Sequence, residues 1–124
     1  TIATLKLGME ILENENAKID CLMGHGGLFK TDYVGQRFMA GAMNTPVTVT
    51  KTAGEGGAWG MAVLAAYSVC DSKLPLDEYL RDFVFADCES TTVEPVASDV
   101  EGFNKYMKLY KSALEVEKSA YKNI

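Results

Sequence analysis

Residues that build metal sites and covalent cross-links are scarce in this chain of 124 amino acids. It contains one histidine, His25, and three cysteines, Cys21, Cys70 and Cys88. An odd number of widely spaced cysteines does not form a disulfide framework, and a single histidine does not complete a Cys/His zinc site. We therefore expect reduced cysteines, no metal held by side chains, and a reducing, cytoplasmic setting.

Positive charge is also in short supply. Lysine and arginine number 12 against 17 aspartates and glutamates, so the formal net charge is −5. A nucleic-acid-binding surface needs a basic patch, and this composition argues against such a partner. No apolar run reaches about 18 residues without a charge, and the N-terminus lacks the segments of a signal peptide. We expect no membrane partner either.

Apolar residues make up 48% of the chain, which is enough to fold one domain of this length around one core. The chain begins at Thr1, inside a helical pattern and without a preceding methionine. We interpret this start as the mark of a fragment of a longer protein.

Apolar periodicity, glycine and proline divide the chain into expected elements. In chain order they are a helix over residues 2–12, a strand over 19–23, a helix over 31–43, a strand over 47–50, a helix over 58–67, a short helix opened by Pro75, an irregular stretch over 84–97 and a long final helix. The strand, helix and strand over residues 19–50 have the spacing of a right-handed βαβ unit with parallel strands. Two strands make a poor independent sheet, so we expect partner strands outside this chain.

Four local expectations follow from side-chain patterns. Thr31 or Asp32 is expected to cap the helix over 31–43. The helix over 58–67 is apolar around its circumference and is expected to be buried on several sides. The pattern Ser98–Glu101 predicts a capping box. The expected inner faces are Val34, Phe38, Met39 and Ala42 in the second helix, Leu76, Tyr79, Leu80 and Phe83 after Pro75, and Val100, Phe103, Met107, Tyr110 and Leu114 in the last helix.

The stretch with the strongest chemical signal is Leu22–Thr31, in which a strand leads through paired glycines into a helix. Backbone N–H groups and the positive end of a helix suit an anion at such a turn. Taken alone, such a pattern more often marks a purely structural turn. It is not a P-loop, and Phe29 stands where a dinucleotide fingerprint needs its third glycine. His25 and Lys30 are expected to face solvent.

The context of this turn resembles a known family. After Gly26 and Gly27 come Gln36, then Asn44-Thr45-Pro46-Val47, then Glu55-Gly-Gly-Ala-Trp-Gly-Met-Ala-Val-Leu-Ala-Ala66. This ordered set resembles the C-terminal domain of FGGY carbohydrate kinases, in the actin/hexokinase superfamily. The residues of these two glycine-rich segments are most similar to those of xylulokinase-type members. The implied fold is α/β, a partial ribonuclease H-like domain with a small parallel βαβ sheet and about five helices.

The resemblance implies that residues 1–124 are the ATP-side, C-terminal domain of a sugar kinase, without its N-terminal sugar-binding domain. ATP and Mg²⁺ are the implied cofactors, and the sugar would bind the missing part. Gly26 and Gly27 would lie against the ATP phosphates and ribose, and Leu28 and Thr31 would border the adenine. No residue here matches the family's catalytic base, so the fragment alone is expected to be inactive.

The sequence departs from the family pattern at two places, and two other functions are possible. Leu28-Phe29 and Trp59 are bulkier than the residues usual in the family. The first alternative is a non-catalytic nucleotide-binding or dimerisation module that forms a homodimer through strand edges and an apolar face. The second is a Rossmann-type dinucleotide binder, against which the missing third glycine counts.

Overall fold

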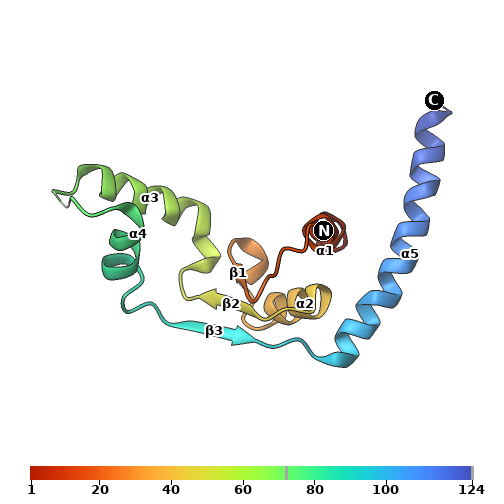
Figure 1. The fold of residues 1–124 in the computed structure, drawn as a ribbon, viewed down its shortest axis with the longest axis horizontal. Helices are drawn as coiled ribbons and strands as arrows, with labels where there is room; N and C mark the ends of the chain where they lie inside the picture. Colours follow the sequence, from red (N-terminus) through yellow and green to blue (C-terminus); the bar gives the residue numbers. More distant parts are fainter. Residues whose placement is uncertain (72, 124) are drawn as a thin grey trace.

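The structure is a computed structural model that describes residues 1–71 and 73–123. A small sheet lies in the middle, with α3 and α4 on one side of it and α5 on the other (Figure 1). The elements are α1 (Ile2–Asn14), β1 (Leu22–Gly24), the 3₁₀ turn η1 (Gly27–Phe29), α2 (Val34–Met43), β2 (Val47–Thr50), the 3₁₀ turn η2 (Ala53–Glu55), α3 (Gly56–Val69), α4 (Leu76–Tyr79), the π-helical turn η3 (Leu80–Val84), β3 (Ser90–Val93) and α5 (Ala97–Lys122).

The sheet confirms the expected βαβ unit and adds a strand to it. β1 and β2 are parallel, with Leu22 opposite Val47, and α2 forms the crossover between them. β3 pairs antiparallel with β2, so the strand order is β1-β2-β3 and the sheet is mixed. The expectation that residues 84–97 are irregular was therefore wrong for residues 90–93. Three of the four residues of β3 are exposed, and the strand consequently lacks the alternation that marks a half-buried strand.

One face of the sheet carries the core and the other carries a row of small polar groups. On the core face, Phe29 and Val47 pack with α2, and Ile2, Met9 and Phe103 add the contribution of α1 and α5. On the other face a hydrogen-bonded row joins β2 and β3 to Cys21, the residue before β1. Thr48 Oγ1 lies 3.2 Å from Cys21 Sγ and 2.7 Å from Thr92 Oγ1.

The buried face of α2 differs from the expected one. Met39 and Ala42 are buried as expected, whereas Val34 is 46% and Phe38 65% exposed. Glycine, alanine and the polar Gln36 take the inner positions instead. Small residues allow the close approach of a helix to its neighbours, and this requirement outweighs hydrophobicity at α2.

Both expected helix caps are absent. Tyr33, with a φ of 67°, precedes α2, and no side chain caps the helix. Thr31 and Asp32 lie in the turn before it. α5 begins at Ala97, so Ser98 already lies within its first turn and the capping box does not form.

α3 and the segment after Pro75 form an arm that little else in the described chain covers. No residue of α3 is buried, and Met61 and Val69 are 69% and 83% exposed. The expectation of burial on several sides was wrong. Among the described residues, α3 is contacted by η2 and by aromatic side chains that follow Pro75, with Trp59 on Phe85 and Tyr67 on Tyr79. His25 lies against its first residue, Gly56. Of the residues expected to be buried after Pro75, Tyr79 and Leu80 are half-buried, but Leu76 and Phe83 are exposed.

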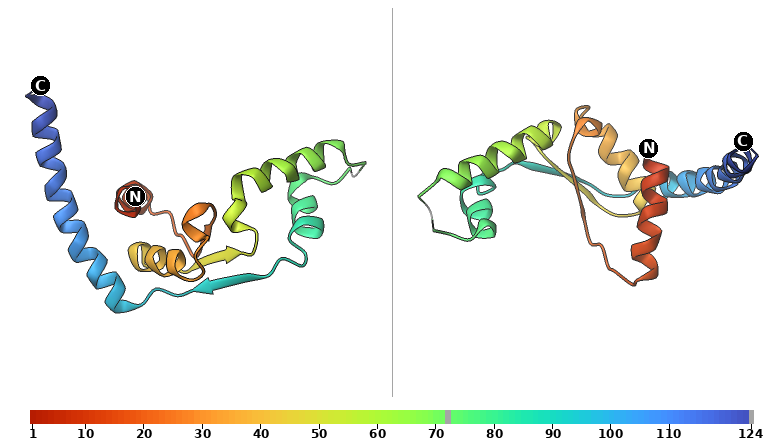
Figure 2. Two further views of the ribbon diagram at one scale, coloured as in Figure 1. Left: turned by 180° about the vertical axis from the view of Figure 1, so that it is seen from behind. Right: turned by 90° about the horizontal axis from the view of Figure 1, so that it is seen from above.

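α5 is anchored at its first half and projects beyond the body (Figure 2). Its expected inner face is confirmed, with Met107 buried and Val100, Phe103, Tyr110 and Leu114 half-buried. Lys111 bonds Glu10 of α1 at 2.7 Å. Arg37 of α2 donates two hydrogen bonds to Asp99, at 2.6 and 3.2 Å.

The Arg37–Asp99 pair makes stability depend on pH. The hydrogen bond from Arg37 holds the pKa of Asp99 below its ordinary value. A lowered carboxyl pKa adds stability above the unfolded-state pKa, and that stability is lost as pH falls through the folded-state pKa. We expect D99N to melt below wild type at pH 7, with a difference that shrinks as the pH falls below about 4. Thermal melting of both proteins between pH 7 and 3 measures this.

The control is Glu117→Gln, which removes a negative charge from the same helix about five turns further on. A D99N difference that stays constant with pH, or that Glu117→Gln reproduces, would contradict the assignment.

Candidate ligand-binding site

Two loops meet at the carboxyl end of the parallel strand pair. The loop after β1 contains Gly26, and the loop after β2 contains η2. The Gly26 N–H donates to the carbonyl of Ala53 at 2.7 Å and joins the loops directly. In open α/β sheets ligands bind outside the carboxyl ends of parallel strands, so this edge is the place to look for a site.

The glycine turn has one strained position and one open position. Gly26 has a φ of 99°, a conformation that side chains disfavour, and its carbonyl accepts from the Phe29 N–H at 3.0 Å. Gly27 is exposed, and a Cβ placed on it would have no atom within 4 Å. A ligand can therefore touch the main chain at Gly27 without meeting a protein side chain.

The four residues predicted to contact the nucleotide lie on this one segment. Gly26, Gly27 and Leu28 belong to the turn itself, and Leu28 is 45% exposed. Thr31 follows two residues after η1 and is exposed. The structure thus brings the four together on one accessible stretch. Their contact with a nucleotide stays a prediction.

Two residues that hold this turn were not among the predicted site residues. Gly35 lies so close to η1 that a Cβ on it would stand 2.3 Å from the Leu28 carbonyl oxygen. Gln36, 5% exposed, hydrogen-bonds the main chain of both β2 and β3. The sequence did contain a signal for these two supports. Gly35 and Gln36 are a glycine and a polar residue that follow one another on the buried side of α2.

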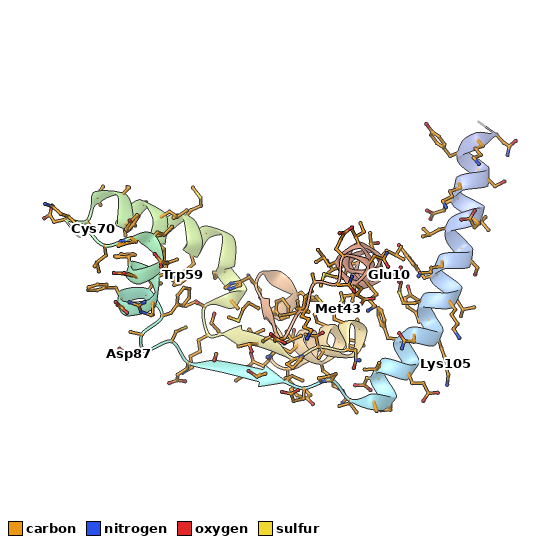
Figure 3. The ribbon with its side chains drawn as sticks, in the orientation of Figure 1. Glu10, Met43, Trp59, Cys70, Asp87 and Lys105 are labelled. Carbon is orange, nitrogen blue, oxygen red and sulfur yellow. The ribbon has the colours of Figure 1, made fainter. Side chains whose placement is uncertain are left out.

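A cavity of about 800 Å³ opens on the far side of η1, between α2, the β2–β3 edge and the start of α3. Its walls include Phe29, Thr50 and Trp59; Trp59 belongs to α3 and is labelled in Figure 3. Lys30 lies on its rim and pairs with Glu55 at 2.9 Å. The four predicted nucleotide residues are not part of its lining, so the turn and the cavity are separate features that share η1.

The remaining candidate groups are unremarkable in their surroundings. His25 faces solvent as expected, whereas Lys30 is exposed but ion-paired. Within residues 1–71 and 73–123, no group of three or more His, Cys, Asp and Glu side chains is placed to hold a metal ion. Across the same residues, no helix combines the length and the apolar character needed to cross a membrane.

The strand–helix–strand unit and its mixed sheet define an α/β domain with two joined loops at the carboxyl end of the parallel strands. The family model for the C-terminal domain of the FGGY family of carbohydrate kinases matches residues 1–69, more than half of the chain. The chain therefore belongs to the FGGY family of carbohydrate kinases.

A solved structure supports the same fold. The ligand-bound xylulose kinase from Lactobacillus acidophilus is similar over 98% of this chain, with a TM-score of 0.68 and 19% identity. At that identity the likeness shows the fold alone. This chain spans 24% of the length of that protein. No curated protein sequence matches the chain.

The contact between Gly35 and Leu28 gives a stability prediction. We expect Gly35→Ala to cost about 1–3 kcal/mol, because the new methyl group overlaps a backbone carbonyl that must move. The matched control is Gly57→Ala in α3, where a Cβ meets no atom within 4 Å and is expected to be neutral or to stabilise by up to about 1 kcal/mol. Denaturant unfolding measures both, and equal stability of the two variants would show that α2 can retreat from η1 without cost.

Proposed function

We propose that this chain forms the ATP-binding wall of a carbohydrate kinase that phosphorylates a sugar hydroxyl, with a xylulose-like ketose as the substrate. The observation that carries the proposal is the Gly26–Gly27 turn, which is open at Gly27 and tied to the loop after β2. Family membership supports the kinase assignment. The similarity to a xylulose kinase supports the choice of sugar.

The part of phosphoryl transfer that this chain supplies is positioning. The transfer requires a fixed phosphate, neutralisation of its charge and a base for the attacking hydroxyl. In the proposal, main-chain N–H groups of the turn hold the phosphates, while Leu28 and Thr31 border the base. Mg²⁺ arrives on the nucleotide phosphates, as this ion usually does, and no ligand in this chain is assigned to it. The base and the sugar pocket belong to other parts of the kinase.

Nucleotide titration tests the proposal directly. ATP-Mg²⁺ is expected to bind the purified chain saturably, with chemical-shift changes in the amides of Gly26, Gly27 and Leu28. NAD, which offers the same adenosine on a different phosphate arrangement, is the comparison ligand. Saturable NAD binding without ATP binding, or ATP shifts confined to another part of the chain, would contradict the proposal.

Gly27→Val separates binding from folding. The valine side chain occupies the ligand's approach, so we expect ATP affinity to fall at least about tenfold. The free energy of unfolding should change by less than about 1 kcal/mol, because a Cβ at this position has no atom within 4 Å. The control is Gly102→Val on α5, which is equally open. Equal ATP affinity for wild type and Gly27→Val would mean that the turn is only structural.

A second candidate function is a module that binds a second copy of itself, and the exposed apolar surface of α3 favours it. Met61, Leu64 and Val69 are 69%, 47% and 83% exposed. If α3 is such an interface, light scattering should show a dimer at micromolar concentration, and M61K combined with V69K should restore the monomer. A monomeric wild-type chain removes this candidate.

A further inference from the structure

We propose that Gln36 is the positioning residue of the nucleotide turn, defined here as Gly26–Thr31. Its buried amide ties the first turn of α2 to two strands at once and so determines where the nucleotide turn lies. Its effect on ATP affinity rests on the proposed function, whereas its effect on the turn does not.

The amide group of Gln36 is engaged with the main chain and one side chain. Nε2 donates to the carbonyl of Val47 in β2 at 3.1 Å and to the carbonyl of Thr91 in β3 at 2.9 Å. Oε1 accepts from Thr91 Oγ1 at 3.3 Å. With 5% exposure, the side chain has little water with which to replace these bonds. A glutamine suits this place because one NH₂ group satisfies two carbonyls.

Two short contacts transmit this placement to the nucleotide turn. Gly35, the neighbour of Gln36, packs against the Leu28 carbonyl, so η1 follows any shift in the start of α2. On its other side the turn is fixed to η2 through the Gly26 N–H and Ala53. The two supports of the turn are therefore Gly35 in α2 and Ala53 in η2. Gln36 sets the distance between them, because it joins α2 to β2, the strand that leads into η2.

The first test replaces the amide with an apolar side chain of similar length, Gln36→Met. NMR hydrogen exchange is measured at three amides of the turn that donate hydrogen bonds, those of Gly26, Phe29 and Lys30. We expect their exchange to accelerate on the order of tenfold, and ATP affinity to fall by a similar factor. The measurement uses the 124-residue chain at a temperature where circular dichroism shows it folded.

The matched control is Arg37→Met, which changes the adjacent residue and breaks the tie from α2 to α5 instead of the tie to the strands. The two variants are compared at equal distance below their melting temperatures. Acceleration in Gln36→Met alone supports the positioning role. Equal acceleration in both variants would show a general loss of stability and would overturn the inference, as would unchanged exchange in Gln36→Met.

The same data separate this inference from the proposed function. If the three amides respond to Gln36→Met but wild type binds no ATP, the positioning role stands and the proposed function fails. If wild type binds ATP and Gln36→Met binds it equally well with unchanged exchange, the proposed function stands and the positioning role fails.

The second variant, Gln36→Glu, covers the case in which Gln36→Met does not fold. An ionised carboxylate would face the Val47 and Thr91 carbonyl oxygens and repel them, while a protonated carboxyl can donate one hydrogen bond. Burial favours the protonated form. The affinity ratio of Gln36→Glu to wild type, and the protection of the three amides, should therefore rise as pH falls from 8 to 5. A ratio and protection that do not change with pH would overturn the inference.

Discussion

The parallel pairing of β1 with β2 is the constraint on which the candidate site depends. Parallel strands place their carboxyl ends at the same edge of the sheet, and the chain must return through α2 to make the pairing. That return brings the loops after both strands together, and the Gly26–Ala53 hydrogen bond is the direct result. An antiparallel pairing of the same strands would place the two loops at opposite edges, and no joined turn would exist.

The arrangement around this pair explains why α2 is built from small residues. The helix has the sheet on one side and α1 and α5 on others, so its buried positions include Gly35, Ala40 and Gly41. Phe38 and Val34 are left on the outside, where they line a groove with Phe103 of α5. Close approach also allows a single polar side chain from α2 to reach the backbone of two strands.

The elements nearest the glycine turn could be predicted from sequence, because their signals are local. Paired glycines, the Pro46 break and the β-branched run after it determine the βαβ unit without reference to distant residues. The four residues predicted to contact a nucleotide came from a family resemblance, and the structure adds that they form one accessible segment. Their supports could not be predicted in the same way. Gln36 bonds the Thr91 carbonyl, and that partner lies in β3, whose mostly exposed residues do not alternate between apolar and polar.

Long-range context also explains the main errors. The circumference of α3 is apolar, which predicts burial, but the sequence does not say whether the covering residues lie in this chain. The capping-box pattern predicts that α5 starts at Asp99, after Ser98, but the helix starts two residues earlier, at Ala97, with Val96 at the N-cap. The Asp99 side chain bonds Arg37 of α2, a contact that the local pattern does not contain.

The hydrogen-bonded row on the second face of the sheet has a consequence for whatever lies against that face. Cys21, Thr48 and Thr92 satisfy one another sideways, so a neighbouring surface need not supply polar partners to cover them. Met23 pairs with Thr48, so its side chain shares this face, and it is 58% exposed. A surface laid there would therefore meet a long apolar side chain beside polar groups that already have partners.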